Sequence, residues 1–145
     1  MSLALPNASG DCFALTPALL EKGFRASAES PRLRMILPIH RKQEATVQRM
    51  LNFFQPGTYI CPHRHPENGA IETIQVLNGA LGFLLFHPNG NLREKFTLKS
   101  DGCGLVDIEP GVWHGMVALE PNTVILEIKQ GPGSMDRTPQ NGGPG

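Results

Sequence analysis

Residues 57–79 read GTYICPHRHPENGAIETIQVLNG, and this stretch contains the features that decide the fold. Pro56-Gly57 predicts a turn before it, and Asn78-Gly79 is a strong signal for a tight β-hairpin at its end. Between these turns, residues 59–65 and 71–77 have the composition of strands and are separated by a short polar loop. The stretch therefore predicts antiparallel β-structure.

The rest of the chain continues this β pattern. Further strands are expected over residues 32–40, 46–54, 80–87, 92–98, 105–108, 114–119 and 123–129. Residues 80–87 are apolar on both faces, which is typical of a central strand. With the two strands above, about nine short strands separated by turns rich in Gly and Pro predict an all-β sandwich or barrel.

One short helix is predicted near the start of the chain. Thr16 can cap its N-terminus, Pro17 suits the first helical turn, and residues 18–22 are good helix formers. Gly23 weakens this helix, and the Ser30-Pro31 pair is expected to end it.

The length of 145 residues predicts one domain, which we assign to residues 1–131. Residues 132–145 are rich in Gly, Pro and polar side chains. Such a segment cannot bury enough apolar surface to offset its ordering entropy. We therefore expect residues 132–145 to form a flexible C-terminal tail.

Charge and composition exclude several classes of partner. The chain has 13 basic and 13 acidic residues and no basic stripe, which excludes a nucleic-acid partner. Its longest apolar stretch, residues 80–86, is far shorter than the roughly 20 residues of a membrane-spanning helix. Cys12, Cys61 and Cys103 form no C-x-x-C pair, and the N-terminus has no signal-peptide pattern. We therefore expect a cytoplasmic protein with free thiols.

Three histidines and one glutamate are the candidate functional residues. His63 and His65 are two residues apart on a predicted strand, so their side chains point to the same face. Glu72 opens the next strand, and His114 follows the turn at Pro110-Gly111. An isolated H-x-H is most often an ordinary surface or core feature. The nitrogen and oxygen donors taken together suit Fe(II), Mn(II), Ni(II), Cu(II) or Zn(II), and resemble the facial triad of non-haem iron oxygenases with a third histidine.

Residues 57–79 resemble the first cupin motif, G-x5-H-x-H-x3/4-E-x6-G. Its positions are taken by Gly57, His63, His65, Glu72 and Gly79. Six residues separate His65 from Glu72, where the motif has three or four. Glu67 is therefore a competing carboxylate, but it stands too close to His65 and too far from Gly79, so Glu72 is preferred.

The second cupin motif, G-x5-P-x-G-x2-H-x3-N, is partly matched by residues 102–118. Gly111 and His114 have the spacing of the motif. Glu109 stands where the motif has Pro, and Ala118 replaces the final Asn. The two motifs together imply the cupin fold, a double-stranded β-helix or jelly-roll barrel. They also imply a metal centre with the ligands His63, His65, Glu72 and His114.

The closer resemblance is to the WbuC family of bacterial cupin metalloproteins, in the RmlC-like superfamily. It rests on residues 31–34 (PRLR), 62–66 (PHRHP), 110–114 (PGVWH) and 127–132 (EIKQGP), and it covers nearly the whole chain except the tail. The resemblance implies one divalent metal ion (Fe, Mn, Zn or Ni) and a small-molecule ligand. By analogy, that ligand is a sugar or nucleotide-sugar derivative of bacterial surface-polysaccharide metabolism. No particular reaction is implied.

Three functions are compatible with these residues. The first is a metal-dependent enzyme, and the second is a non-catalytic module that senses or stores a small metabolite or a metal. The third is a metal-independent sugar epimerase, for which Tyr59 would be the acid. Other polar strand residues near the expected cavity are His40, Arg34, Arg49, Gln75 and Glu127.

Two further expectations concern packing and assembly. Cys61 has the same strand parity as the histidines and can therefore face the cavity, either as a thiol sensitive to oxidation or as a small buried hydrophobic residue, and the second interpretation is preferred. Strand 32–40 is the candidate contact of a homodimer, because exposed sheet edges are often closed by pairing.

Overall fold

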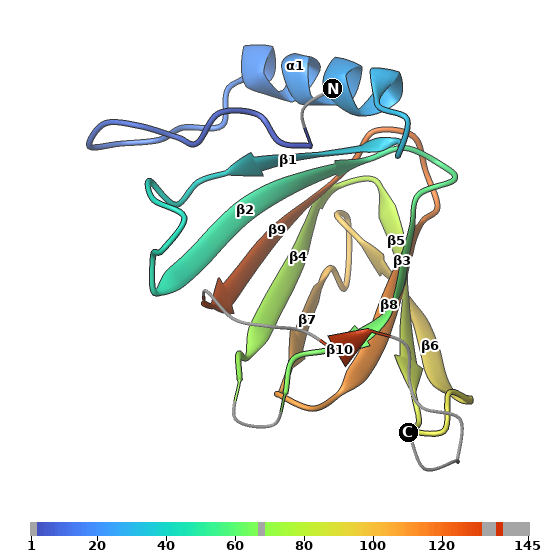
Figure 1. Ribbon diagram of the computed structural model, residues 1–145. Coiled ribbons are helices and arrows are strands. Elements are labelled where there is room, and N and C mark those ends of the chain that lie inside the picture. The colour runs from blue at the N-terminus through green and yellow to red at the C-terminus, as the bar shows by residue number, and fades with distance from the viewer. Residues whose placement is uncertain (1–2, 67–68, 132–135, 138–145) are drawn as a thin grey trace.

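Two antiparallel sheets facing each other form the body of the molecule (Figure 1). The computed structural model describes residues 3–66, 69–131 and 136–137. Within these residues the first sheet has the order β1 (Arg34–Pro38), β2 (Val47–Phe54), β9 (Thr123–Gln130), β4 (Glu72–Asn78) and β7 (Leu105–Ile108). The second has the order β10 (Asp136–Arg137), β3 (Tyr59–Arg64), β8 (Trp113–Ala118), β5 (Ala80–Phe86) and β6 (Leu92–Lys99).

The strands predicted from the sequence are confirmed, each with its ends within two residues of the expected positions. β5 lies between β8 and β6, in agreement with its apolar character on both faces. Strands distant in sequence alternate in each sheet, as in a double-stranded β-helix. In the predicted tail, residues 136 and 137 pair with Arg64 and His63 of β3. The other tail residues lie outside the described ranges, so the expected flexibility stays a prediction.

Helix α1 (Pro17–Glu29) has the predicted cap, because the Thr16 hydroxyl accepts a hydrogen bond from the Leu19 amide at 3.2 Å. It packs on the outer face of the first sheet beside β1 and β2 (Figure 1). Gly23, predicted to weaken the helix, is buried where a Cβ atom would overlap the ring of Phe53. A glycine is therefore required for this close approach, despite its cost in helix propensity. Among the described residues, no helix has the length and apolar character needed to span a membrane.

Two apolar clusters stabilise the two sides of the first sheet. The cluster under α1 contains Leu37, Leu51, Phe53 and Val124. The cluster between the sheets contains Phe54, Ile74, Val76, Leu81, Phe83, Leu98, Ile108, Met116, Ala118 and Ile125. These side chains fill the space at the β4, β5 and β6 side, and a polar pocket remains toward β1, β2, β9 and β3.

The edge of β1 is covered by the start of the same chain. Ala4 forms a parallel bridge with Ile36, and the Leu5 amide donates to the Ile36 carbonyl at 2.8 Å. The Ala8 amide donates to the Pro38 carbonyl at 2.9 Å. These backbone groups of β1 are therefore already hydrogen-bonded, and they are not available for the strand pairing that we expected in a homodimer.

The contact between Gly23 and Phe53 gives a test of this packing. Gly23→Ala should lower the free energy of unfolding, because overpacking costs about 1–3 kcal/mol while alanine regains up to about 1 kcal/mol of helix propensity. Gly102→Ala is the control, since a Cβ atom there would meet nothing within 4 Å. Urea unfolding measures both variants. A Gly23→Ala protein as stable as the control would contradict the close packing of α1 on the sheet.

Candidate metal centre

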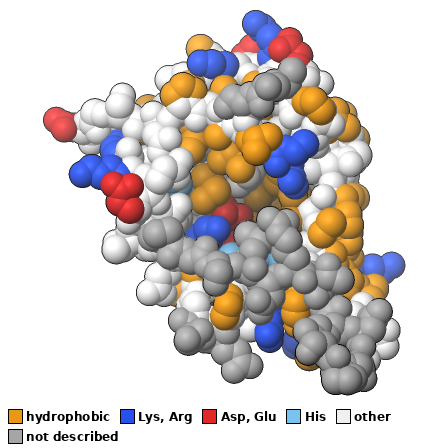
Figure 2. Space-filling view, viewed as in Figure 1, with side chains coloured by type: hydrophobic (Ala, Val, Ile, Leu, Met, Phe, Trp, Pro, Cys, Tyr) orange, Lys and Arg blue, Asp and Glu red, His pale blue; other side chains and the backbone are white. Residues whose placement is uncertain are grey.

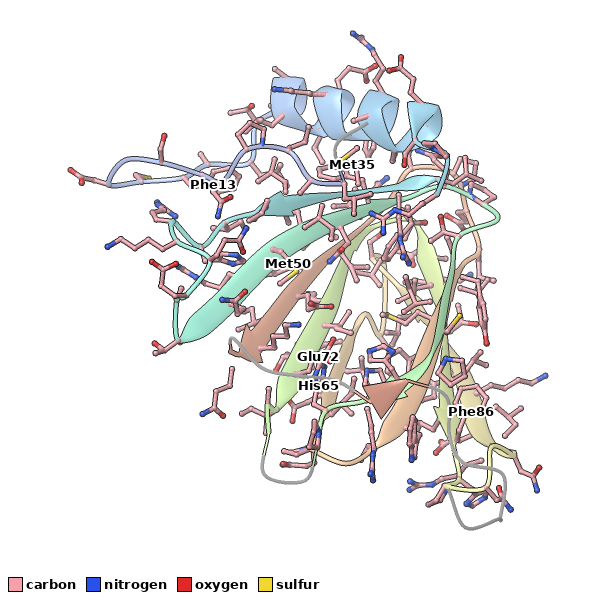
Figure 3. The ribbon with its side chains drawn as sticks, in the orientation of Figure 1. Phe13, Met35, Met50, His65, Glu72 and Phe86 are labelled. Carbon is pink, nitrogen blue, oxygen red and sulfur yellow. The ribbon has the colours of Figure 1, made fainter. Side chains whose placement is uncertain are left out.

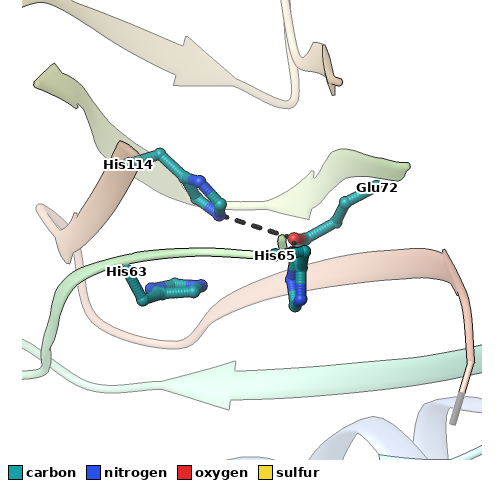
Figure 4. A group of neighbouring side chains, drawn as sticks. All are labelled: His63, His65, Glu72 and His114. Carbon is teal, nitrogen blue, oxygen red and sulfur yellow. Dashed lines mark hydrogen bonds and ion pairs between the residues drawn. The ribbon is translucent and has the colours of Figure 1, made fainter. Parts of the chain in front are cut away.

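The four predicted ligand residues come together from both sheets (Figure 4). His63 on β3 is directly paired with His114 on β8, and His65 follows the end of β3. Glu72 is the first residue of β4, in the opposite sheet. Figure 3 shows His65 and Glu72 close together in the space between the sheets. The pairing of β3 with β8 brings His63 and His114 together, and with His65 they place three imidazoles opposite one carboxylate.

The four side chains are compactly arranged and almost completely buried. One donor atom from each residue lies within 4.8 Å of the others. The Oε2 atom of Glu72 is 2.9 Å from His65 Nε2 and 3.4 Å from His114 Nε2. The exposed fractions are 7% for His63, 6% for His65, 2% for Glu72 and 1% for His114. Titratable side chains that are packed together and buried in this way require partners, because burying an isolated charge has a large unfavourable free energy.

Backbone carbonyls select the tautomers of two histidines. His63 Nδ1 is 2.9 Å from the Cys61 carbonyl, and His114 Nδ1 is 2.9 Å from the Val112 carbonyl. A carbonyl oxygen can only accept, so each Nδ1 carries a proton and donates it. In the neutral ring, Nε2 then carries a lone pair. Metal-binding histidines commonly have this arrangement, in which the second ring nitrogen donates to a carbonyl.

The lone pair of His114 is not satisfied by the protein groups around it. Among the described residues its Nε2 atom is buried and has no hydrogen-bond partner. The Glu72 oxygen at 3.4 Å is too distant for a good hydrogen bond, and it also presents lone pairs rather than a proton. A cation bound at this point would interact favourably with both atoms. The donor set thus fits a divalent metal ion.

Burial and mutual contacts shift the pKa values in the cluster. Burial, followed by the nearby His114, lowers the pKa of His63 to about 4. This favours the neutral imidazole, which is the form that binds metals. Burial acts to raise the pKa of Glu72, but the surrounding imidazoles, of which His65 is within hydrogen-bond distance at 2.9 Å, outweigh it and hold the pKa below its usual range. Glu72 is therefore a carboxylate, which is the ligand form.

The loop before β8 is joined to the end of β3. The Gly111 amide donates to the His65 carbonyl at 2.6 Å. Gly111 has a φ of 84°, in the left-handed region that favours glycine. This contact links the two predicted motifs and fixes the backbone at His65. On the other side, the Phe83 ring stacks on His114, with centroids 5.8 Å apart and an interplanar angle of 11°.

A pocket of about 300 Å³ opens beside the cluster, and Figure 2 shows it as a hollow with acidic and basic side chains surrounded by apolar ones. His63, His65 and Glu72 form part of its wall. The other lining residues are Arg32, Arg34, Ile36, Met50, Asn52, Phe54, Tyr59, Ile60, Cys61, Met116, Glu127 and Lys129. The candidate ligand residues are therefore accessible to a small molecule.

Of the other polar residues proposed from the sequence, the pocket contains Arg34 and Glu127 and lacks His40, Arg49 and Gln75. His40 is buried and lies 2.9 Å from the Arg49 carbonyl through Nδ1, which is a structural contact. Burial, together with the charge of Glu72, raises the pKa of Glu127 well above its usual value. Glu67, the competing carboxylate, lies outside the described residues.

Sequence reasoning missed three polar lining residues, which are Arg32, Asn52 and Lys129. Lys129 is two residues from Glu127 and therefore has its strand parity, which was the available signal. The interpretation of Cys61 as a buried residue is wrong, because it is exposed at the pocket wall. The reason is an irregularity of β3 between Ile60 and His63, which changes the alternation of the side chains.

Solved structures with the same fold are similar to this chain at low sequence identity. KdgF from Halomonas sp. has a TM-score of 0.54 and 22% identity, over 70% of this chain and 81% of that one. An oxalate oxidase in complex with the substrate analogue glycolate has a TM-score of 0.57 and 16% identity, over 74% of this chain and 56% of that one.

An uncharacterised Klebsiella pneumoniae protein with a double-stranded β-helix domain has a TM-score of 0.53 and 21% identity, over 71% of this chain and 80% of that one. These similarities establish the cupin fold. No curated protein matches the sequence. Residues 15–98 match the family model described as a domain of unknown function, DUF6016, and the chain therefore belongs to this family.

Proposed function

We propose that this protein is a metal-dependent cupin in which His63, His65, Glu72 and His114 hold one divalent ion for a small organic ligand in the adjacent pocket. The observation that carries the proposal is the buried, unsatisfied Nε2 atom of His114 facing the Glu72 carboxylate. A metal-independent epimerase does not account for this arrangement, because its catalytic acid and base do not require three histidines and a glutamate around one point.

The chemistry of the centre follows from its donors. A divalent ion with three imidazole nitrogens and one carboxylate supplies Lewis-acid or redox chemistry to an oxygen atom of a bound ligand. The protein contributes fixed donors, because the carbonyls of Cys61 and Val112 hold two of the rings. Apolar side chains of the pocket, such as Met50 and Met116, limit the access of water. The donor set suits Fe, Mn, Zn or Ni alike.

The resemblance to the WbuC family supports a more specific proposal. The ligand would be a sugar or nucleotide-sugar derivative of bacterial surface-polysaccharide metabolism, and the protein would act in the cytoplasm. A homodimer also belongs to this proposal. Because residues 4–8 cover the edge of β1, the exposed Leu105 and Ile128 on the outer face of β7 and β9 are better candidates for its contact. Light scattering at micromolar concentration tests the assembly.

A non-catalytic module that binds a metabolite would use the same pocket and the same ion. The two functions differ in turnover. Metal-loaded protein assayed for O2 consumption and for conversion of sugar derivatives distinguishes them, since a module binds without consuming its ligand.

Metal content is the first test of the centre. Protein purified without chelators or a nickel column should contain close to one equivalent of a divalent metal by elemental analysis. His63→Ala and His114→Ala should lose at least nine-tenths of it, because each removes one of four ligands. His87→Ala is the matched control, since His87 is exposed at a turn. Circular dichroism checks that all variants are folded. A wild-type protein that retains no metal after incubation with Fe(II), Mn(II), Zn(II) or Ni(II) would refute the proposal.

The choice of carboxylate ligand is tested separately. Glu72→Gln keeps the shape of the side chain and removes its charge, so metal affinity should fall by at least the roughly 10–100-fold that the loss of a group hydrogen-bonded to a ligand typically costs. Glu67→Gln and the exposed Glu94→Gln should bind the metal as the wild type does. Competition with a chromophoric chelator measures all three affinities. If Glu67→Gln weakens binding and Glu72→Gln does not, the ligand is Glu67.

A further inference from the structure

The cationic side chains of the pocket are the part of its wall that the metal centre does not use. Three of them line it: Arg32, Arg34 and Lys129. Arg34 begins β1, and Arg32 lies in the turn before it. Lys129 is on β9, directly opposite Glu72 of β4. One cation therefore lies at the metal end of the pocket, and two come from the start of β1.

Strand register separates the two arginines from the metal centre. Arg34 is paired with Phe54, and Phe54 with Thr123 of β9. Glu72 is paired with Lys129, six residues further along β9. At 3.3–3.4 Å per residue this is about 20 Å of strand. The long arginine side chains shorten the gap but do not remove it, so the pocket is elongated and has two polar ends.

The two ends differ in their side chains. Among the described lining residues the acidic side chains are Glu72 and Glu127, and both belong to the half of the sheet near the metal centre. The other end has two arginines, and guanidinium groups recognise carboxylates and phosphates through paired hydrogen bonds.

The backbone between the arginines is held in a costly conformation. Leu33 has a φ of 56°, in the left-handed region that a bulky residue rarely adopts. Its carbonyl accepts from the Gln55 amide at 2.9 Å and from the Thr58 hydroxyl at 2.5 Å. This turn lets both arginines line the same pocket. The Nη2 atom of Arg32 donates to the Leu3 carbonyl at 3.5 Å. Strained backbone of the kind seen at Leu33 is often found at ligand sites.

We propose that the pocket binds a small organic acid whose carboxylate contacts Arg32 and Arg34 and whose hydroxyl or carbonyl oxygen reaches the metal centre at the other end. This inference rests on the proposed function for its metal end only. The volume of about 300 Å³ is sufficient for a ligand the size of a sugar acid. The apolar wall of Ile36, Met50 and Phe54 fits the C–H face of such a ligand.

The test uses matched pairs of an acid and a neutral molecule on the metal-loaded protein. Glucuronate is compared with glucose, and 6-hydroxyhexanoate with 1,6-hexanediol, by calorimetric titration. Glycolate is included because its carboxylate and hydroxyl groups are on adjacent carbon atoms, so it cannot contact the arginines and the metal centre at once. We expect at least one of the long acids to bind at least tenfold more tightly than its neutral partner and than glycolate. Equal binding of acids and neutral molecules, or no binding of either long acid at 10 mM, would overturn the proposal.

Variants locate the acid end. Arg32→Gln and Arg34→Gln should each weaken acid binding at least tenfold and leave metal content unchanged, and Arg32→Lys should restore part of the affinity. Arg93→Gln on the exposed surface of β6 is the control. Loss of metal in the arginine variants would place them in the metal centre and contradict the two-ended pocket. If glucose 6-phosphate binds more tightly than glucuronate, the group recognised by the arginines is a phosphate, and the proposal of a carboxylate ligand is wrong.

Metal-free protein separates this inference from the proposed function. If the wild type never binds a metal but still binds glucuronate through Arg32 and Arg34, the metal function fails and the acid site holds. If the metal is present and acid binding does not depend on the arginines, the acid site fails and the metal function holds. Acid affinity that is identical with and without bound metal would contradict the contact at the metal end.

Discussion

The buried carboxylate of Glu72 is the group on which the arrangement of the site depends. It is 2% exposed and projects from one sheet toward three imidazoles held mainly by the other. A buried ionised carboxylate is tolerated only where nearby donors or cations compensate its lost hydration. His65 gives part of this compensation through the contact at 2.9 Å. The sheets must therefore keep their spacing and register at this point, and a cation between Glu72 and His114 would complete the compensation.

The sequence allowed the fold and the core of the site to be predicted, because both depend on short-range patterns. Turn signals such as Asn78-Gly79 fixed the strand boundaries, and the two-residue spacing of His63 and His65 placed both side chains on one face. Glu72 was less certain, since the loop before it is longer than in the cupin motif. The position of His114 opposite His63 depends on the pairing of β8 with β3, and its role as a ligand was expected only from the resemblance to the second cupin motif.

The acid end of the pocket could not be predicted, because it arises from long-range register. Arg34 and Lys129 share one wall only through the order β1, β2, β9 in the first sheet. No local pattern determines which strands become neighbours at such separations. Gly23 is a similar case, since its helix propensity is poor while its missing side chain makes room for Phe53. The exposed position of Cys61 depends on an irregularity of β3 that alternation rules do not include.

The hydrogen bonds that orient two of the imidazoles involve the carbonyl oxygens at positions 61 and 112, two residues before each histidine. Every amino acid supplies such an oxygen. The alignment of these metal donors is thus encoded by the path of the main chain, independently of the side chains that precede them. A lineage of this protein can therefore replace Cys61, which lines the pocket, and alter the selectivity of the pocket while the carbonyl that holds His63 is inherited unchanged.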